Sequence, residues 1–200
     1  MKYLLSFFIF FTVSLFAQAQ ESDVSLRVAY GKASTADLGE IISGTNNHII
    51  NDYRVLSADG AFLLGDDFLD FPISYYSNVG LSYFKDDGYS DSFELTMFLK
   101  LFYKPEIFKN YVRVGFGEGI SYTTAVLQVE KDEAIKENGK NSKFLNYLDI
   151  TLDFNAGKLL SQKDLYIGLL LKHRSGIFGL INNVEHGGSN YNCVYIEKKF

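Results

Sequence analysis

Apolar and polar residues alternate one by one along parts of this chain. In residues 92–103 the apolar set is Phe93, Leu95, Met97, Leu99 and Leu101, and the polar set is Glu94, Thr96 and Lys100. In residues 143–156 the apolar set is Leu148, Ile150, Leu152 and Phe154, against Asp149, Thr151, Asp153 and Asn155. A period of two puts the sets on opposite faces of a β-strand, whereas a helix repeats every 3.6 residues. The pattern therefore predicts strands with one apolar and one polar face.

Eight segments qualify as strands, and their connections are alternately long and short. The predicted strands are 24–33, 53–65, 72–84, 92–103, 111–123, 143–156, 164–178 and 189–200. One set of connections is 34–52, 85–91, 124–142 and 179–188, and the short set is 66–71, 104–110 and 157–163. Long outer loops opposite short periplasmic turns are typical of an up-and-down membrane barrel. We predict an all-β fold, an eight-stranded antiparallel up-and-down transmembrane β-barrel.

Alternation alone does not decide which face lies inside. A soluble barrel of lipocalin type would turn its apolar face inward around a small ligand. The final Phe200, the lone cysteine Cys193 and a set of aromatic residues at strand ends favour the membrane version. That aromatic set is Tyr30, Tyr83, Tyr103, Tyr122 and Phe144. We expect apolar faces toward lipid.

The polar faces carry charges of both signs, which predicts a filled interior. These charges are Arg27, Asp59, Glu94, Lys100, Arg113, Asp149, Asp153, Lys172 and Arg174. In a narrow barrel such groups would pair across the lumen and fill it. The third outer loop is also charged, with Glu130, Asp132, Glu133 and Glu137 near three lysines, and we expect it to be solvated. The charges predict a plugged lumen and disfavour a pore.

The amino-terminal segment predicts export. Lys2 is followed by an apolar run from Leu4 to Phe16 and by Ala17-Gln18-Ala19, which fits a signal-peptide cleavage site. We predict two regions, a signal peptide at 1–19 and an outer-membrane β-barrel at 20–200. Together with the final aromatic residue, this predicts the bacterial cell outer membrane. The net charge of −5 argues against nucleic acid as a partner, and a single cysteine excludes an internal disulfide.

Polar residues interrupt the lipid-facing side near the outer end of the seventh strand. Leu169 and Leu171 set the outward parity there, and the same parity carries His173 and Ser175. Counting back in twos from Phe200 turns Asn192 and Asn190 outward on the eighth strand. Asn146 has outward parity on the sixth strand, and Glu118 has it on the fifth. We expect Asn146, His173, Ser175, Asn190 and Asn192 to cluster on the outside of the barrel.

A His and a Ser two residues apart can perform nucleophilic catalysis. Their Cα atoms lie about 6–7 Å apart on one face, so His173 can act as general base and Ser175 as nucleophile. The backbone N–H of Gly176 and the amides of Asn146, Asn190 and Asn192 are candidate oxyanion donors. The group that orients the imidazole is open between Glu185, Asn190, Asn192 and Glu118. The competing interpretation is that the histidine is a tolerated polar residue at the membrane interface.

This pattern resembles the lipid A 3-O-deacylase family of small outer-membrane barrels. The matching residues are His173-Arg174-Ser175 within KHRSGIFG, and the closing strand SNYNCVYIEKKF. The resemblance implies a hydrolase that removes an ester-linked acyl chain from lipid A of lipopolysaccharide, with its site facing the lipid and with no cofactor or metal. Gly176 stands where the family usually has Asn. Asn190 and Asn192 stand where it has Glu, and Glu185 lies nearby in the loop.

A second hypothesis assigns no catalysis to the chain. It describes a small outer-membrane barrel whose outer loops bind a ligand or stabilise the envelope. It predicts that His173 and Ser175 can be replaced freely, whereas loop residues matter. Neither hypothesis specifies an oligomeric state, and the acyl position is open under the first.

Overall fold

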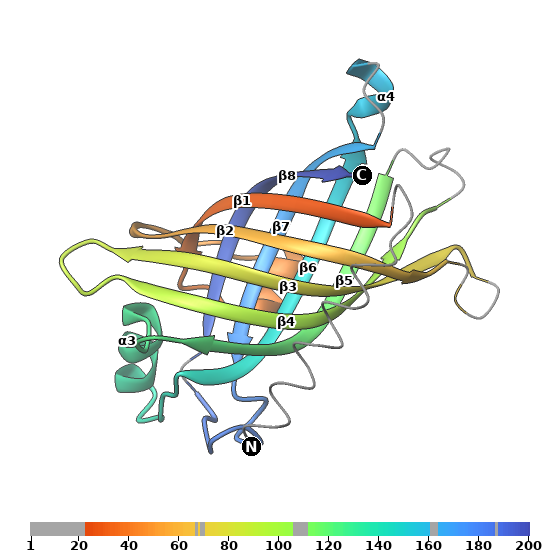
Figure 1. The fold of residues 1–200 in the computed structure, drawn as a ribbon. Helices are drawn as coiled ribbons and strands as arrows, with labels where there is room; N and C mark the ends of the chain where they lie inside the picture. Colours follow the sequence, from red (N-terminus) through yellow and green to blue (C-terminus); the bar gives the residue numbers. More distant parts are fainter. Residues whose placement is uncertain (1–22, 67, 69–70, 106–111, 161–163, 187) are drawn as a thin grey trace.

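The alternating segments form one closed antiparallel barrel. In the computed structural model the described residues are 23–66, 68, 71–105, 112–160, 164–186 and 188–200, so the predicted signal peptide at 1–19 lies outside them. The strands are β1 (Val24–Ser34), β2 (Ile49–Gly65), β3 (Ile73–Asp86), β4 (Ser92–Tyr103), β5 (Val112–Thr123), β6 (Phe144–Asn155), β7 (Leu165–Ser175) and β8 (Ser189–Lys199). Each strand pairs with the next, and β8 pairs with β1 to close the barrel (Figure 1). The predicted fold class is confirmed.

In the described parts of the connections there are three short helices, where the sequence predicted only loops. They are α2 (Leu38–Ser43), α3 (Gln128–Lys136) and α4 (Gly157–Leu160). At the start of α2, the Glu40 carboxylate accepts a hydrogen bond from the Asp37 backbone N–H at 3.0 Å. Such a bond satisfies one of the free donors that every helix start carries. Among the described residues, no helix is long and apolar enough to cross a membrane.

Most predicted strand boundaries lie within one or two residues of those in the structure, and two differ by three or more. β2 begins at Ile49 instead of residue 53, because Ile49 pairs with Ser34 after a register shift in the ladder. β7 ends at Ser175 instead of residue 178. Ile177 and Phe178 have positive φ angles of 49° and 52°, which a strand does not accommodate. The chain then folds back, and the Ile181 N–H donates to the Gly176 carbonyl at 2.9 Å.

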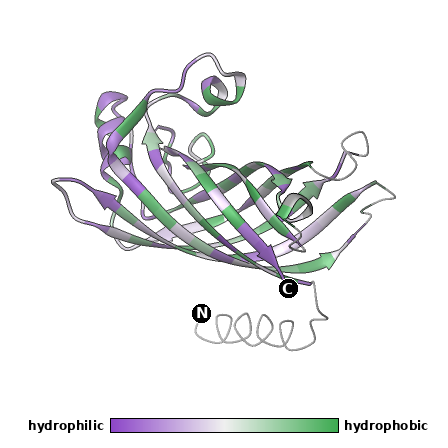
Figure 2. Ribbon diagram, turned by 90° about the horizontal axis from the view of Figure 1, so that it is seen from above, coloured by the Kyte–Doolittle hydropathy of each residue, from purple (hydrophilic) through white to green (hydrophobic). Residues whose placement is uncertain are grey.

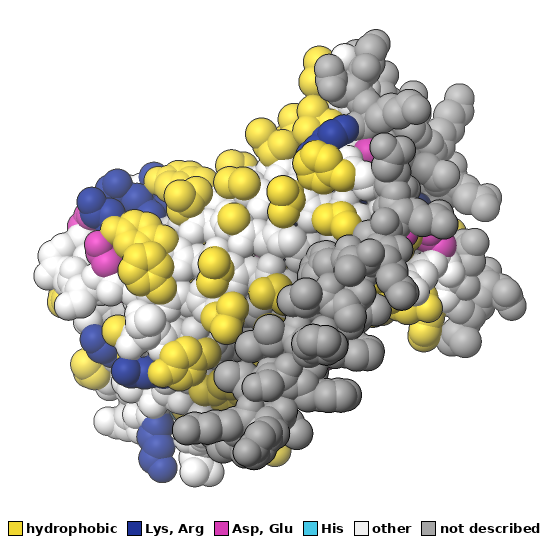
Figure 3. Space-filling view, in the orientation of Figure 1, with side chains coloured by type: hydrophobic (Ala, Val, Ile, Leu, Met, Phe, Trp, Pro, Cys, Tyr) yellow, Lys and Arg dark blue, Asp and Glu magenta, His cyan; other side chains and the backbone are white. Residues whose placement is uncertain are grey.

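The barrel wall is apolar outside and polar inside. Leu95 is 45% exposed and Leu99 63%, whereas their sequence neighbours Glu94 and Lys100 are 2% and 1% exposed. Hydropathy alternates along the strands in Figure 2. Hydrophobic side chains spread over the visible wall in Figure 3, and charged ones gather near its ends. This is the arrangement of a membrane barrel and the reverse of the lipocalin type.

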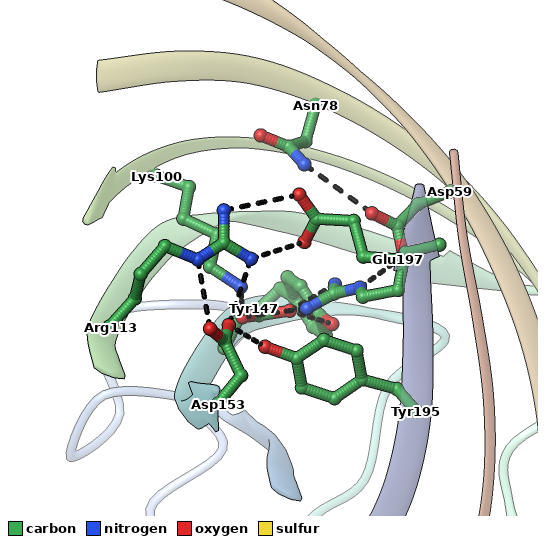
Figure 4. Close-up of polar contacts among 10 residues, drawn as sticks. Asp59, Asn78, Lys100, Arg113, Tyr147, Asp153, Tyr195 and Glu197 are labelled. Carbon is green, nitrogen blue, oxygen red and sulfur yellow. Dashed lines mark hydrogen bonds and ion pairs between the residues drawn. The ribbon is translucent and has the colours of Figure 1, made fainter. Parts of the chain in front are cut away.

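The lumen is filled by ion pairs that cross between strands. Arg27 contacts Asp59 at 2.8 Å and Asp149 at 2.5 Å. Lys100 also contacts Asp149 at 2.5 Å. Arg113 pairs with Asp153 and with Glu197 (Figure 4). The charges predicted to fill the barrel therefore do so, which agrees with the predicted plug.

The third outer loop packs into the outer end of the lumen. We expected this loop to be solvated, and that expectation was wrong for part of it. Leu127, which precedes α3, and Val129 on the helix pack into the same buried cluster as Phe84 and Tyr191. Glu130 is fully buried, and its carboxylate accepts from Arg174 at 2.7 Å. Burial raises the pKa of Glu130 to about 7, although the neighbouring Arg174 acts to lower it.

Candidate functional site

The outer ends of β6, β7 and β8 bring four of the predicted residues together. Ser175 lies opposite Asn146 on β6, and His173 lies opposite Asn190 on β8. The intervening Arg174 points into the lumen, where it reaches Glu94 and Glu130. The residues on either side of Arg174 must then point outward, because successive side chains of a strand alternate. His173 and Ser175 thus have the outward direction expected from the sequence.

A pair of hydrogen bonds determines the tautomer of His173. The Asn190 Nδ2 donates to the Ala36 carbonyl at 2.9 Å, which orients the amide and leaves its Oδ1 toward the imidazole. Oδ1 lies 2.7 Å from His173 Nδ1. Because an amide oxygen only accepts, Nδ1 carries the proton in this network. The lone pair of the neutral ring is then on Nε2, where a general base needs it.

A cavity of about 860 Å³ opens over this patch. Phe116 and Glu118 of β5 and Leu148 of β6 line it from the barrel wall. The first outer loop, α3 and the fourth outer loop supply the other sides. The cavity lies on the outside of the strands that carry the His/Ser pair. A lipid lying against the barrel could therefore enter it without crossing the lumen.

Two polar groups in the cavity are free to bind another molecule. Asn146 is 6% exposed, and its side chain forms no hydrogen bond within the described part of the chain. Ser175 is half-buried, and no hydrogen bond joins its hydroxyl to His173 or to any other described residue. Hydrogen bonds of a catalytic pair are often long before a substrate is bound. The arrangement provides a hydroxyl, an oriented imidazole and an amide donor on one surface.

Gly176 permits the fourth outer loop to pack directly on the end of β7. A Cβ at this position would lie 2.0 Å from the backbone oxygen of Val184. Any other residue would push the loop away, because real Cβ atoms do not approach so closely. This close approach gives a physical reason for glycine at position 176, where the lipid A 3-O-deacylase family, which the sequence resembles, usually has Asn.

The remaining predicted residues divide into two groups. Glu185 and Glu118 line the cavity, but within the described residues neither forms a hydrogen bond with His173. Asn192 lies outside the cavity lining, and its Nδ2 donates to Asn47 Oδ1 at 2.9 Å. Among the four orienting candidates, the contact with His173 belongs to Asn190.

Sequence reasoning missed Ala36, whose carbonyl orients Asn190. The two residues are 154 positions apart, and a backbone carbonyl leaves no signature in a sequence. It also missed the contribution of α3 to the cavity. A possible signal was the run of helix-forming residues 128–136.

Comparisons with known proteins show the fold and no family. No family model and no curated protein matches the sequence. The structure is similar to that of the outer membrane enzyme PagL, with a TM-score of 0.55 and 10% identity over 88% of this chain and 99% of that chain. Ail of Yersinia pestis in a bilayer nanodisc gives a TM-score of 0.48 and 12% identity, covering 90% of this chain and 100% of that one. At such identities the likeness concerns the barrel fold alone.

Proposed function

We propose that this protein is a serine esterase of the bacterial outer membrane that removes an ester-linked acyl chain from lipid A. Residues 1–19 would direct its export. The observation that carries the proposal is the His173–Asn190 hydrogen bond, which leaves Nε2 free as a base on the same outward face as Ser175. A tolerated histidine at a membrane interface needs no such orientation. Similarity in fold to an outer membrane enzyme agrees with the proposal.

The proposed reaction begins with proton transfer from the Ser175 hydroxyl to His173 Nε2. The Ser175 oxygen attacks the ester carbonyl, and the carbonyl electrons move to its oxygen. The amide of Asn146 and the backbone N–H of Gly176 are the proposed donors to this oxyanion. When the intermediate collapses, the C–O bond to the sugar breaks and the imidazolium protonates the leaving oxygen. Water then releases the fatty acid by the same steps, which restores Ser175.

Asn190 can orient the imidazole but cannot neutralise its positive charge. In serine hydrolases whose triad Asp is replaced by Asn, much of the lost activity comes from the wrong tautomer of the catalytic histidine. Here the bond to Ala36 turns the amide oxygen toward Nδ1, so the tautomer is the productive one. We keep Glu185 in the proposed catalytic set, because it lines the same cavity and is a candidate for the missing negative charge.

Lipid A fits the position of the site. It forms the outer leaflet of the outer membrane, and it carries its acyl esters at the level where polar headgroups meet hydrocarbon. His173 and Ser175 lie at the outer end of β7, above the exposed Leu169. Phe116 and Leu148 offer apolar contact along the wall to an acyl chain that points toward the membrane centre.

Mass spectrometry of lipid A from cells producing the protein tests this function. We expect wild type to produce lipid A that lacks one acyl chain and Ser175→Ala to leave lipid A intact. Ser77→Ala is a matched control, because Ser77 lies on the outward face of β3, away from the cavity. Folding is checked by the heat-dependent shift in electrophoretic mobility that barrels show. Identical lipid A from wild type and Ser175→Ala would favour the non-catalytic barrel instead.

A further inference from the structure

Glu118 is a carboxylate on the lipid-facing side of β5. Its neighbours on that face, Phe116 and Ile120, are 47% and 44% exposed, and Glu118 is exposed between them. A charged side chain toward lipid lowers barrel stability by an amount that grows with depth, and such residues often mark functional sites. Within the described residues Glu118 forms no hydrogen bond or ion pair that would offset this cost.

The strand register places Glu118 in one row with the His/Ser pair. Glu118 lies opposite Leu148, and Leu148 lies opposite His173. Two strand spacings separate Glu118 from His173, or roughly 10 Å. This distance is too long for the carboxylate to orient the imidazole, with Leu148 between them. Both residues nevertheless line the same cavity, so one bound lipid can touch both.

We propose that Glu118 accepts a hydrogen bond from a donor on the bound lipid, an amide N–H or a hydroxyl near the ester. An ionised carboxylate has only acceptor sites, so ester and phosphate oxygens offer it no favourable contact. A charge-assisted hydrogen bond is about twice as strong as a neutral one, and it gains strength where water is scarce. The inference rests on the proposed function, and it names the class of substrate: lipids with hydrogen-bond donors beside the scissile ester.

Lipid binding can test Glu118 separately from catalysis. Ser175→Ala is reconstituted with equal amounts of sphingomyelin and phosphatidylcholine, and retained lipids are counted by native mass spectrometry. Both lipids have a phosphocholine headgroup, but only sphingomyelin carries an amide N–H and a hydroxyl beside its chains. We expect several-fold enrichment of sphingomyelin. An analogue without the hydroxyl tells which of the two donors is used.

Substitutions at two positions of β5 decide the result. Glu118→Leu should abolish the preference for sphingomyelin, and Glu118→Gln should retain part of it, because an amide oxygen also accepts. Tyr122→Leu, an outward residue of the same strand, should leave it unchanged. Equal retention of the two lipids, or a preference that survives Glu118→Leu, overturns the inference. Ser175→Ala needs no turnover to bind lipid, so absence of esterase activity in wild type would refute only the proposed function.

Discussion

At the scale of single residues, Asn190 connects the first outer loop to the imidazole. Its NH₂ group donates to Ala36 and its oxygen accepts from His173, so neither half of the amide is free to rotate. An Asn held on one side only could turn over and offer its NH₂ to the ring, which would reverse the tautomer. The backbone of the loop therefore determines the protonation pattern of a side chain on β7.

Replacement of Asn190 by Ala should slow ester hydrolysis by about 10²-fold, because general base catalysis typically contributes about 10²–10⁴-fold. The nitrogen NMR shifts of His173 should change from the Nδ1–H tautomer to a mixture. Asn192→Ala is the matched control, on the same strand and face but bonded to Asn47. If the two variants are equally active and His173 keeps a single tautomer in both, Asn190 does not orient the imidazole.

At the scale of elements, α3 shows how a charged segment can be buried on one side. Glu130 meets Arg174 and Ser189 inside the barrel mouth, while Lys136 and Glu137 stay exposed. The helix has nine residues, which is too short to be stable by itself in water. Its contacts with the lumen must therefore supply most of its stability, and the cavity wall that it forms depends on them.

Docking of α3 should weaken as pH rises through about 7. Burial raises the pKa of Glu130 from its ordinary 4.5 to about 7, so the folded loop binds the proton more tightly than the unfolded one. This stabilisation, on the order of 3 kcal/mol, is complete below pH 4.5, decreases as pH rises from there toward the folded pKa of about 7, and is lost above it.

Amide hydrogen exchange of α3 measures this effect, after correction for intrinsic rates. Protection in wild type should fall between about pH 5 and pH 8. In Glu130→Gln it should stay constant, since Gln keeps the shape and does not titrate. Glu137→Gln, at the exposed end of the helix, should behave as wild type. The prediction fails if Glu130→Gln shows the same pH dependence as wild type.

At the scale of the whole molecule, opposite charges tie together strands that are not neighbours in the barrel. Asp149 of β6 is fully buried and contacts both Arg27 of β1 and Lys100 of β4. Arg113 of β5 reaches Glu197 of β8. These contacts span the lumen and supplement the backbone ladders, which join only adjacent strands. Each of these buried charges has a partner of opposite sign, as a buried charge requires.

Removal of one charged side chain from this network should strongly lower the stability of the protein. Asp149→Asn leaves Arg27 and Lys100 without their shared carboxylate, and we expect a loss of about 3–5 kcal/mol in the free energy of unfolding. Asp87→Asn breaks the exposed pair with Arg54 and should cost about 0–1 kcal/mol. Urea unfolding in lipid micelles, followed by circular dichroism, compares the two. Equal losses would mean that the lumen is hydrated enough to screen its charges.

The strands, the direction of their side chains and the charged filling of the lumen could all be predicted from the sequence. These follow from a period of two, which is a local property of an extended backbone. The outward direction of His173 and Ser175 belongs to this group. Strand ends were less accurate, because the positive φ angles at Ile177 and Phe178 come from loop packing and not from residue type.

Which of these residues contact one another depends on the folded barrel. The pairing of β7 with β8 brings Asn190 to His173, and closure of the barrel brings Ala36 to Asn190. The burial of Glu130 likewise depends on loop packing, and the alignment of Glu118 with Leu148 and His173 across three strands depends on strand register. Such contacts join residues far apart in the chain, and they form only when strand pairing and barrel closure reduce those separations to a few ångströms.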